Sequence, residues 1–136
     1  MSNVIKLDSD QIQKLAIFES ITRANLKDFL EDETELTFIV NSKDLGKAIG
    51  KGANNVRVLE NTFKKRVLII GFEPDFKDFA RNLFKPIAIK NMLLQNDSLI
   101  INIFGSQMAF PSKKVKKAKI LLTKYFSNIK DIIVKV

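Results

Sequence analysis

The feature that most constrains the fold is a repeat, because one order of apolar patterns occurs twice within 136 residues. A helical pattern comes first, two strand patterns follow, and two more helical patterns precede a closing strand. The first set occupies residues 1–72 and the second residues 73–136, joined through the short segment "GFEPD". We therefore predict an α+β chain of two small αββααβ units, each with a three-stranded sheet and helices packed on one face.

The first set begins with capping residues in "DSDQIQKLAIFESIT", which predict a helix over about 9–21. The residues at helical spacing in it are Ile12, Leu15, Ala16 and Ile21, with Ile17 and Phe18 alongside. A hairpin follows, and "ELTFIVN" turns Leu36, Phe38 and Val40 to one face. Ser42 is expected to cap a short helix. "NNVRVLENTF" predicts another helix, and "VLIIGF" predicts a buried strand.

The second set repeats this order. Pro74 and Asp75 mark a helix start, and the apolar stripe behind them consists of Phe76, Phe79, Ala80, Leu83 and Phe84. Two strands are expected around the turn 95–97, a helix over 112–126 and a last strand in "DIIVKV". The Phe-rich positions of both sets match these apolar stripes, so we assign them to the core.

Composition narrows the chemistry. The chain has neither His nor Cys, so the commonest general base, metal ligand and activated thiol are missing. The net charge is +8, and residues 73–136 hold 12 Lys/Arg against 5 Asp/Glu, a balance of +7. This basic excess favours a polyanionic partner. We expect no enzyme, no cofactor and no metal site. No signal-peptide layout or membrane-spanning run is present, so we expect a cytoplasmic protein.

The stretch "DLGKAIGKGANNV", residues 44–56, holds three of the five glycines. A Walker A loop requires G-x-x-x-x-G-K followed by Ser or Thr, but Gly46 and Gly50 are too close and Gly52 replaces the hydroxyl. A dinucleotide fingerprint requires a third glycine and a preceding strand. A helix–loop–helix with "GKGA" instead lets a phosphate backbone approach closely, because Gly50 and Gly52 carry no side chain. These are the mechanics of a KH loop, which clamps about four nucleotides.

The segment "IFESITRANLKDFLEDETELTFIVNSKDLGKAIGKGANNVRVLENTFKKRVLII" resembles the first KH unit of archaeal NusA-like proteins, and "NLFKPIAIKNMLL" is similar to the start of their second unit. The resemblance implies two tandem type II KH folds, single-stranded RNA binding and a role in transcription elongation, termination or antitermination. RNA polymerase is a partner by this resemblance alone. We expect a monomer. The candidate RNA-binding residues are Lys47, Ile49, Gly50, Lys51, Gly52, Ala53, Asn54 and Arg57.

Within this assignment, the RNA backbone is expected over residues 50–53 and the bases in an apolar groove near Ile49 and strand 35–41. Arg57 should point outward near that groove, with a solvated arginine as the alternative. Asn54 and Asn55 are expected either to cap the following helix or, for Asn54, to stand beside the loop.

Two departures from the family pattern bear on this site. Ala53 stands where the loop should close with Gly, which is serious only if that position requires a positive φ. In the second unit, aligning Val115 with Val56 places "AFPS", residues 109–112, at the loop position, and the helix before it shrinks to little more than "GSQM". The second loop is therefore expected to have lost its clamp.

The second unit keeps its charge. On a helical wheel, the apolar face consists of Val115, Ala118, Leu121, Leu122, Tyr125 and Phe126. The expected phosphate-tracking patch consists of Lys113, Lys114, Lys116, Lys117 and Lys124. An ordinary solvated helix face is the alternative, but residues 113–130 contain no acid. Two rival functions also stay open: a degenerate KH pair that binds a protein such as RNA polymerase or a ribosomal partner, and a phosphate-handling enzyme.

Overall fold

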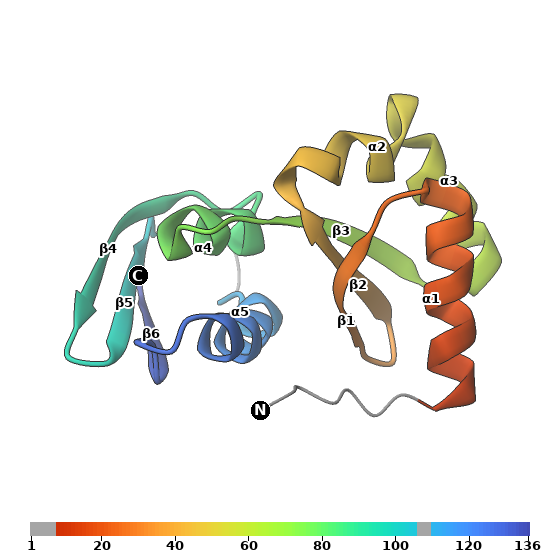
Figure 1. The fold of residues 1–136 in the computed structure, drawn as a ribbon. Coiled ribbons are helices and arrows are strands. Elements are labelled where there is room, and N and C mark those ends of the chain that lie inside the picture. Colours follow the sequence, from red (N-terminus) through yellow and green to blue (C-terminus); the bar gives the residue numbers. More distant parts are fainter. Residues whose placement is uncertain (1–7, 106–109) are drawn as a thin grey trace. The chain divides into compact units, whose positions relative to one another are not determined.

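Residues 8–105 and 110–136 are described by the computed structural model of the chain. The chain divides into two units, residues 1–72 and 73–136. Each unit holds one three-stranded sheet, in the order β1-β2-β3 in the first and β4-β5-β6 in the second (Figure 1). In both sheets the first pair of strands is antiparallel and the second pair is parallel. The predicted α+β class with three-stranded sheets is confirmed.

The first unit follows the predicted order of elements. These are α1 (Ser9–Thr22), β1 (Leu26–Glu31), β2 (Glu35–Asn41), the 3₁₀ turn η1 (Ser42–Asp44), α2 (Leu45–Ile49), the 3₁₀ turn η2 (Lys51–Ala53), α3 (Asn54–Phe63) and β3 (Arg66–Phe72). Asp8 caps α1 by accepting a hydrogen bond from the Gln11 amide at 2.8 Å. Asp32 makes the hairpin turn by accepting hydrogen bonds from the amides of Thr34 and Glu35.

The core of the first unit lies between the sheet and its helices. Phe38 of β2 is fully buried and its ring stacks on Phe18 of α1, with ring centroids 4.3 Å apart. Leu36 and Val40, on the same side of β2, and Leu59 of α3 are also fully buried. The predicted shared face of β2 is therefore the core face. Glu35, Thr37 and Ile39 alternate with these residues and are buried as well, so no side chain from 35–40 is exposed.

One local expectation for this unit was wrong, and the burial of α1 does not follow its apolar spacing. The buried side of α1 is centred on Phe18 and Thr22, whereas Ile12 is 55% exposed and Ala16 is exposed. The hydroxyl of Thr22 donates to the Phe18 carbonyl at 2.8 Å, which satisfies it inside the core and lets a polar residue take this position. Ser42 does not cap a helix either, because it is the first residue of η1, and α2 starts three residues later.

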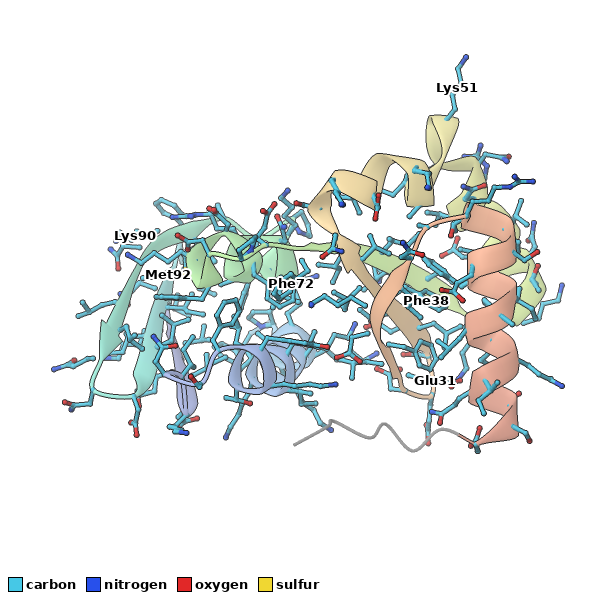
Figure 2. The ribbon with its side chains drawn as sticks, in the orientation of Figure 1. Glu31, Phe38, Lys51, Phe72, Lys90 and Met92 are labelled. Atoms are coloured by element: carbon cyan, nitrogen blue, oxygen red, sulfur yellow. The ribbon has the colours of Figure 1, made fainter. Side chains whose placement is uncertain are left out.

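A charged cluster around Glu31 connects several elements of the first unit. Glu31 lies at the end of β1 (Figure 2). Its carboxylate accepts hydrogen bonds from Lys14 of α1 at 2.6 Å and from Lys65 at 2.8 Å. Burial raises the pKa of Glu31, but the hydrogen bonds and charges of the two lysines outweigh it, and the net pKa lies below its usual value. The cluster thus joins α1, β1 and the residue before β3 through a carboxylate that is ionised near neutral pH.

The second unit repeats the frame of the first. Its elements are α4 (Phe76–Phe84), β4 (Ile89–Gln95), β5 (Ser98–Ile103), α5 (Ser112–Tyr125) and β6 (Asp131–Lys135). Asp75 caps α4, and the predicted stripe packs inward, with Phe79, Ala80, Leu83 and Phe84 buried. Both helices lie on one face of the sheet (Figure 1). Apart from Gly105, the short helix expected at "GSQM" lies outside the described residues.

The first strand of each sheet carries a bulge at the same place. The register shifts between Leu26 and Asp28 in β1 and between Ile89 and Asn91 in β4. One lysine is left over in each strand, Lys27 and Lys90, and its ammonium lies over a phenylalanine ring. The distance from Nζ to the ring centroid is 4.2 Å for Lys27 and Phe72 and 5.9 Å for Lys90 and Phe104. The two units thus share even this β-bulge, which changes the direction of one lysine side chain in each strand.

Candidate nucleic-acid interface

The loop "GKGA" has a backbone that only some residues can adopt. Gly50 has φ 80° and ψ 164°, a region essentially restricted to glycine. A Cβ atom at Gly50 would lie 2.9 Å from the side-chain amide of Asn55. Gly52 is left-handed, with φ 60°, and a Cβ built there meets nothing within 4 Å. The two glycines therefore serve different ends: Gly50 makes the turn sterically feasible, and Gly52 leaves the outer surface of the loop bare.

Ala53 occupies the position where a positive φ matters. Its φ is 59° and its ψ is 27°, so this alanine is left-handed at the N-cap of α3. An L-residue with a Cβ pays about 1–2 kcal/mol for that conformation. Ala53 therefore does adopt a positive φ, the condition under which replacing Gly by Ala matters. The loop keeps its shape despite this strain.

Three hydrogen bonds hold the strained loop. The Ala53 amide donates to the Gly50 carbonyl at 3.1 Å, and the Asn55 side-chain amide donates to the Lys47 carbonyl at 3.2 Å. The Arg57 guanidinium donates to the Gly52 carbonyl at 2.7 Å. Together they tie the loop to α2 before it and to α3 after it, so the loop is set in shape without a ligand.

These contacts revise the expected roles of two residues. The cap of α3 is Ala53 and makes no side-chain hydrogen bond, so neither asparagine caps the helix. Asn55 instead bridges to α2, and Asn54 is exposed at the first position of α3. Arg57 is exposed as expected, and its guanidinium donates a hydrogen bond to the loop itself. A sequence shows the asparagine and the arginine but not which backbone oxygen each will reach.

The charge around the loop is uniformly positive. Lys47 and Lys51 are exposed, and Figure 2 shows the Lys51 side chain projecting outward from the tip of the loop. Residues 45–59 contain no acid, and among residues 8–105 and 110–136 neither lysine has a carboxylate within ion-pair distance. The N-terminus of α3 adds the positive end of its dipole. The loop therefore presents a surface suited to an anion.

The apolar groove expected beside the loop is only partly present. Ile49 is half-buried next to the loop, and Ala48 before it is buried and anchors α2 in the core. The strand expected to form the other wall is covered, because Glu35 to Val40 are all buried and Asn41 alone is exposed. The expectation that strand 35–41 lines a groove was therefore wrong except at its last residue.

In the second unit the corresponding connection is shorter. Twelve residues, 42–53, separate β2 from α3, whereas eight residues, 104–111, separate β5 from α5. Phe110 is 49% exposed, Pro111 precedes the first residue of α5, and Ala109 lies outside the described residues. The connection is thus four residues shorter than the one that holds α2 and the glycine loop.

The lysines of α5 surround its apolar face. Ala118, Leu121 and Leu122 are buried, and Val115, Tyr125 and Phe126 are half-buried, which is the face that the wheel predicts. Lys113, Lys116 and Lys124 are exposed, whereas Lys114 and Lys117 are half-buried. Lys119 pairs with Asp131 at 3.3 Å. Asp131 comes directly after the acid-free stretch 113–130, so the sequence of that stretch alone does not reveal this ion pair.

Comparison with known proteins decides the family. Over 97 residues the chain is 31% identical to a probable transcription termination protein NusA of Halobacterium salinarum, which covers 71% of this chain and 70% of that protein. The chain belongs to the archaeal NusA family. Another NusA, from Thermoplasma acidophilum, is 23% identical over 98% of this chain and 97% of its own length.

Other NusA relatives are longer. The match to the probable transcription termination protein NusA of Methanococcus vannielii is 36% identical over 88 residues, 65% of this chain and 51% of that protein. The chain thus spans about half the length of that relative. No protein-family model matches the chain.

A solved structure supports the fold of this NusA-family chain. The crystal structure of APE1850 superposes with a TM-score of 0.73, at 23% sequence identity, over 95% of this chain and 100% of that one. This likeness and the two mixed three-stranded sheets are consistent with the expected tandem KH-type folds. Within residues 8–105 and 110–136, no helix has the length and apolarity that crossing a membrane requires. In the same ranges, no group of acidic side chains is placed to hold a metal ion.

Proposed function

We propose that this NusA-family chain binds single-stranded RNA through the "GKGA" loop, in transcription termination or antitermination. The observation that carries the proposal is the loop backbone: Gly50, Gly52 and Ala53 all have positive φ directly before α3. A backbone held this way lets a phosphate chain pass close to the loop, and Lys51 supplies a charge at its tip.

The residues in and around the loop have different roles in this proposal. Gly50 and Gly52 allow close approach of the RNA backbone, and Lys47 and Lys51 attract its phosphates. Arg57 and Asn55 hold the loop in place through their hydrogen bonds to Gly52 and Lys47. Ile49 offers half-exposed apolar surface to a base beside the loop. The lysine patch of α5 would add affinity without reading sequence. The place in transcription is inferred from the names of the relatives.

The test replaces the two middle residues of the loop. Lys51→Asp with Gly52→Asp adds negative charge, and Lys51→Asn with Gly52→Asn is the control of the same shape. Asn and Asp both tolerate the left-handed φ of Gly52, and no atom lies within 4 Å of the new Cβ. Gly50 is left intact because any Cβ there would strike Asn55. Fluorescence anisotropy with a single-stranded RNA of about ten nucleotides measures the affinity.

We expect the aspartate variant to bind RNA at least about tenfold more weakly than the asparagine variant at moderate salt. Aspartate repels the phosphates, whereas asparagine only fails to attract them. For the unchanged protein, log K should fall linearly with log salt, with a slope of about 0.7 per phosphate contact. Arg57→Gln should weaken binding and leave that slope unchanged if Arg57 holds the loop, whereas a lost phosphate contact would reduce the slope.

Equal binding by the aspartate pair and the unchanged protein would rule out the loop as the clamp. If the unchanged protein bound no RNA at all, the alternative function would replace this one: a KH pair that binds a protein, such as RNA polymerase. The shortened connection of the second unit, residues 104–111, favours that alternative.

A further inference from the structure

The sheet of the second unit leaves one face open. Side chains alternate along its strands, and Leu99, Ile101 and Ile132 are buried on the side of α4 and α5. On the other side, the pairing register places Leu93, Ile100 and Ile133 in one row across the three strands. Leu93 is 56% and Ile133 is 40% exposed. This row is a strip of apolar surface on the face that carries no helix (Figure 1).

A polar row lies beside the apolar one. The register aligns Asn91, Asn102 and Lys135 across the same strands. The Asn102 side-chain amide donates to the Asn91 side-chain oxygen at 2.6 Å. This hydrogen bond does not use the amide hydrogens of Asn91, which is exposed, or the side-chain oxygen of Asn102, which is half-buried. An adjacent donor and acceptor can pair with the edge of a nucleobase.

An aromatic ring completes this face. Phe104 follows Asn102 by two residues, continues the same alternation and is 55% exposed. The bulge in β4 brings Lys90 to within 5.9 Å of its ring centroid. An exposed Phe beside a lysine offers a base a stacking surface and offers its phosphate a charge.

The charge on the open face is complementary to a polyanion. Its cations are Lys90 and Lys135, one on each outer strand. The carboxylate in the described part of this face is Asp131, which is paired with Lys119 at 3.3 Å. Apolar surface, amide groups, one aromatic ring and flanking lysines together fit bases with phosphates on either side.

We propose that this face is a second binding site for single-stranded RNA. We call it the sheet platform, made of the rows Leu93–Ile100–Ile133 and Asn91–Asn102–Lys135 with Lys90 and Phe104. One base stacks on Phe104, the amide pair binds the edge of a neighbouring base, and Lys90 and Lys135 contact phosphates. The site is separate from the "GKGA" loop, lies on a face that the loop mechanism does not use, and does not depend on the loop for its chemistry.

The experiment removes the ring with a matched control. Phe104→Ala is compared with Phe110→Ala, because Phe110 is also an exposed phenylalanine of the second unit, at 49%, but precedes α5. Both changes are made in the full chain, alone and together with Lys51→Asp and Gly52→Asp. Binding of a single-stranded RNA of about ten nucleotides is measured by anisotropy, and circular dichroism checks folding.

We expect the loop variant to retain weak binding and Phe104→Ala to reduce that remainder at least about fivefold, the loss expected for one stacked base. Phe110→Ala should change nothing. Lys90→Gln, which keeps the strand and most of the side-chain length, should reduce the remainder about two- to threefold and lower the salt dependence. The side-chain amide resonances of Asn91 and Asn102 should shift when RNA is added.

Three results would overturn the platform. The loop variant could bind no RNA, Phe104→Ala could match Phe110→Ala, or an acidic apolar peptide could shift the Asn91 and Asn102 resonances where RNA does not, which would assign the face to a protein. The two proposals fail separately: if Phe104→Ala weakens binding while the loop variant alone binds normally, the platform stands and the loop clamp falls.

Discussion

The two units share a frame and differ in the connection that carries the candidate clamp. Both have the same strand order, the same mixture of antiparallel and parallel pairing and a bulge at the same place in the first strand. Between the second strand and the next long helix, however, the first unit has 12 residues and the second has eight. The buried core therefore specifies the fold, while the connection between two elements is left to vary with function.

The substitutions with the largest expected effect test whether each unit has its own hydrophobic core. Phe38→Ala in the first unit should destabilise that unit by about 3–5 kcal/mol, because a fully buried ring stacked on Phe18 is lost. Phe79→Ala, also fully buried, is the matched change in the second unit. Hydrogen exchange should show lost protection in β1–β3 for the first change and in β4–β6 for the second. Equal loss in both sheets would mean one cooperative structure.

A smaller effect concerns the charged cluster at the base of the first unit. The pairing register places Leu94 in β4 where Glu31 lies in β1, so the second unit has no counterpart to this carboxylate. Glu31→Gln should destabilise the first unit by about 1–2 kcal/mol near neutral pH, since two charged hydrogen bonds are lost.

The sign of the pH dependence follows from the lowered pKa of Glu31. Its contribution is fully present above the pKa of the unfolded chain and is lost as pH falls through the lower pKa of the folded state. Thermal unfolding from neutral to acidic pH should therefore show a steeper loss of stability for the unchanged protein than for Glu31→Gln. Parallel curves would show that the cluster adds no pH-linked stability. Asp131, whose pKa is also lowered, by the Ile132 amide and by Lys119, is common to both proteins and cancels in the difference.

The smallest effect concerns Ala53. Ala53→Gly removes the strain of the left-handed φ but adds freedom to the unfolded chain, so we expect a net stabilisation of about 0.5–1 kcal/mol. RNA affinity should rise slightly or stay the same, because the backbone shape is already set. Ala53→Val should be clearly destabilising, since a β-branched residue fits this conformation worst. Differential scanning calorimetry of the unchanged protein, Ala53→Gly and Ala53→Val measures these differences in stability. A loss of stability in Ala53→Gly would mean that the strain inferred from φ is relieved by other contacts.

Much of the fold follows from local patterns in the sequence. The bounds of α3 match "NNVRVLENTF", and the apolar stripe of α4 packs as its spacing predicts. Apolar spacing and burial differ where tertiary contacts override local rules. Thr22 can be buried because its hydroxyl donates to a backbone carbonyl, whereas the apolar Ile12 is exposed.

The candidate site was predictable in position but not in mechanism. The glycine spacing locates the loop, yet only coordinates show that Ala53 is left-handed and that Gly50 is confined by Asn55. The roles of Asn55 and Arg57 depend on which backbone oxygens lie within reach, and these depend on how α2 is placed against α3. The sheet platform depends on register between strands, which a one-residue shift would reverse.

The difference in connection length has a consequence for protein engineering. Each connection leaves the middle strand and enters the helix that precedes the parallel strand, so we expect one segment to be exchangeable for the other. Exchanging eight residues for twelve would give the second unit a glycine loop of its own. In the first unit Ala48 is buried and Leu45 packs against the core, so the interior of the second unit would have to accommodate the counterparts of both side chains.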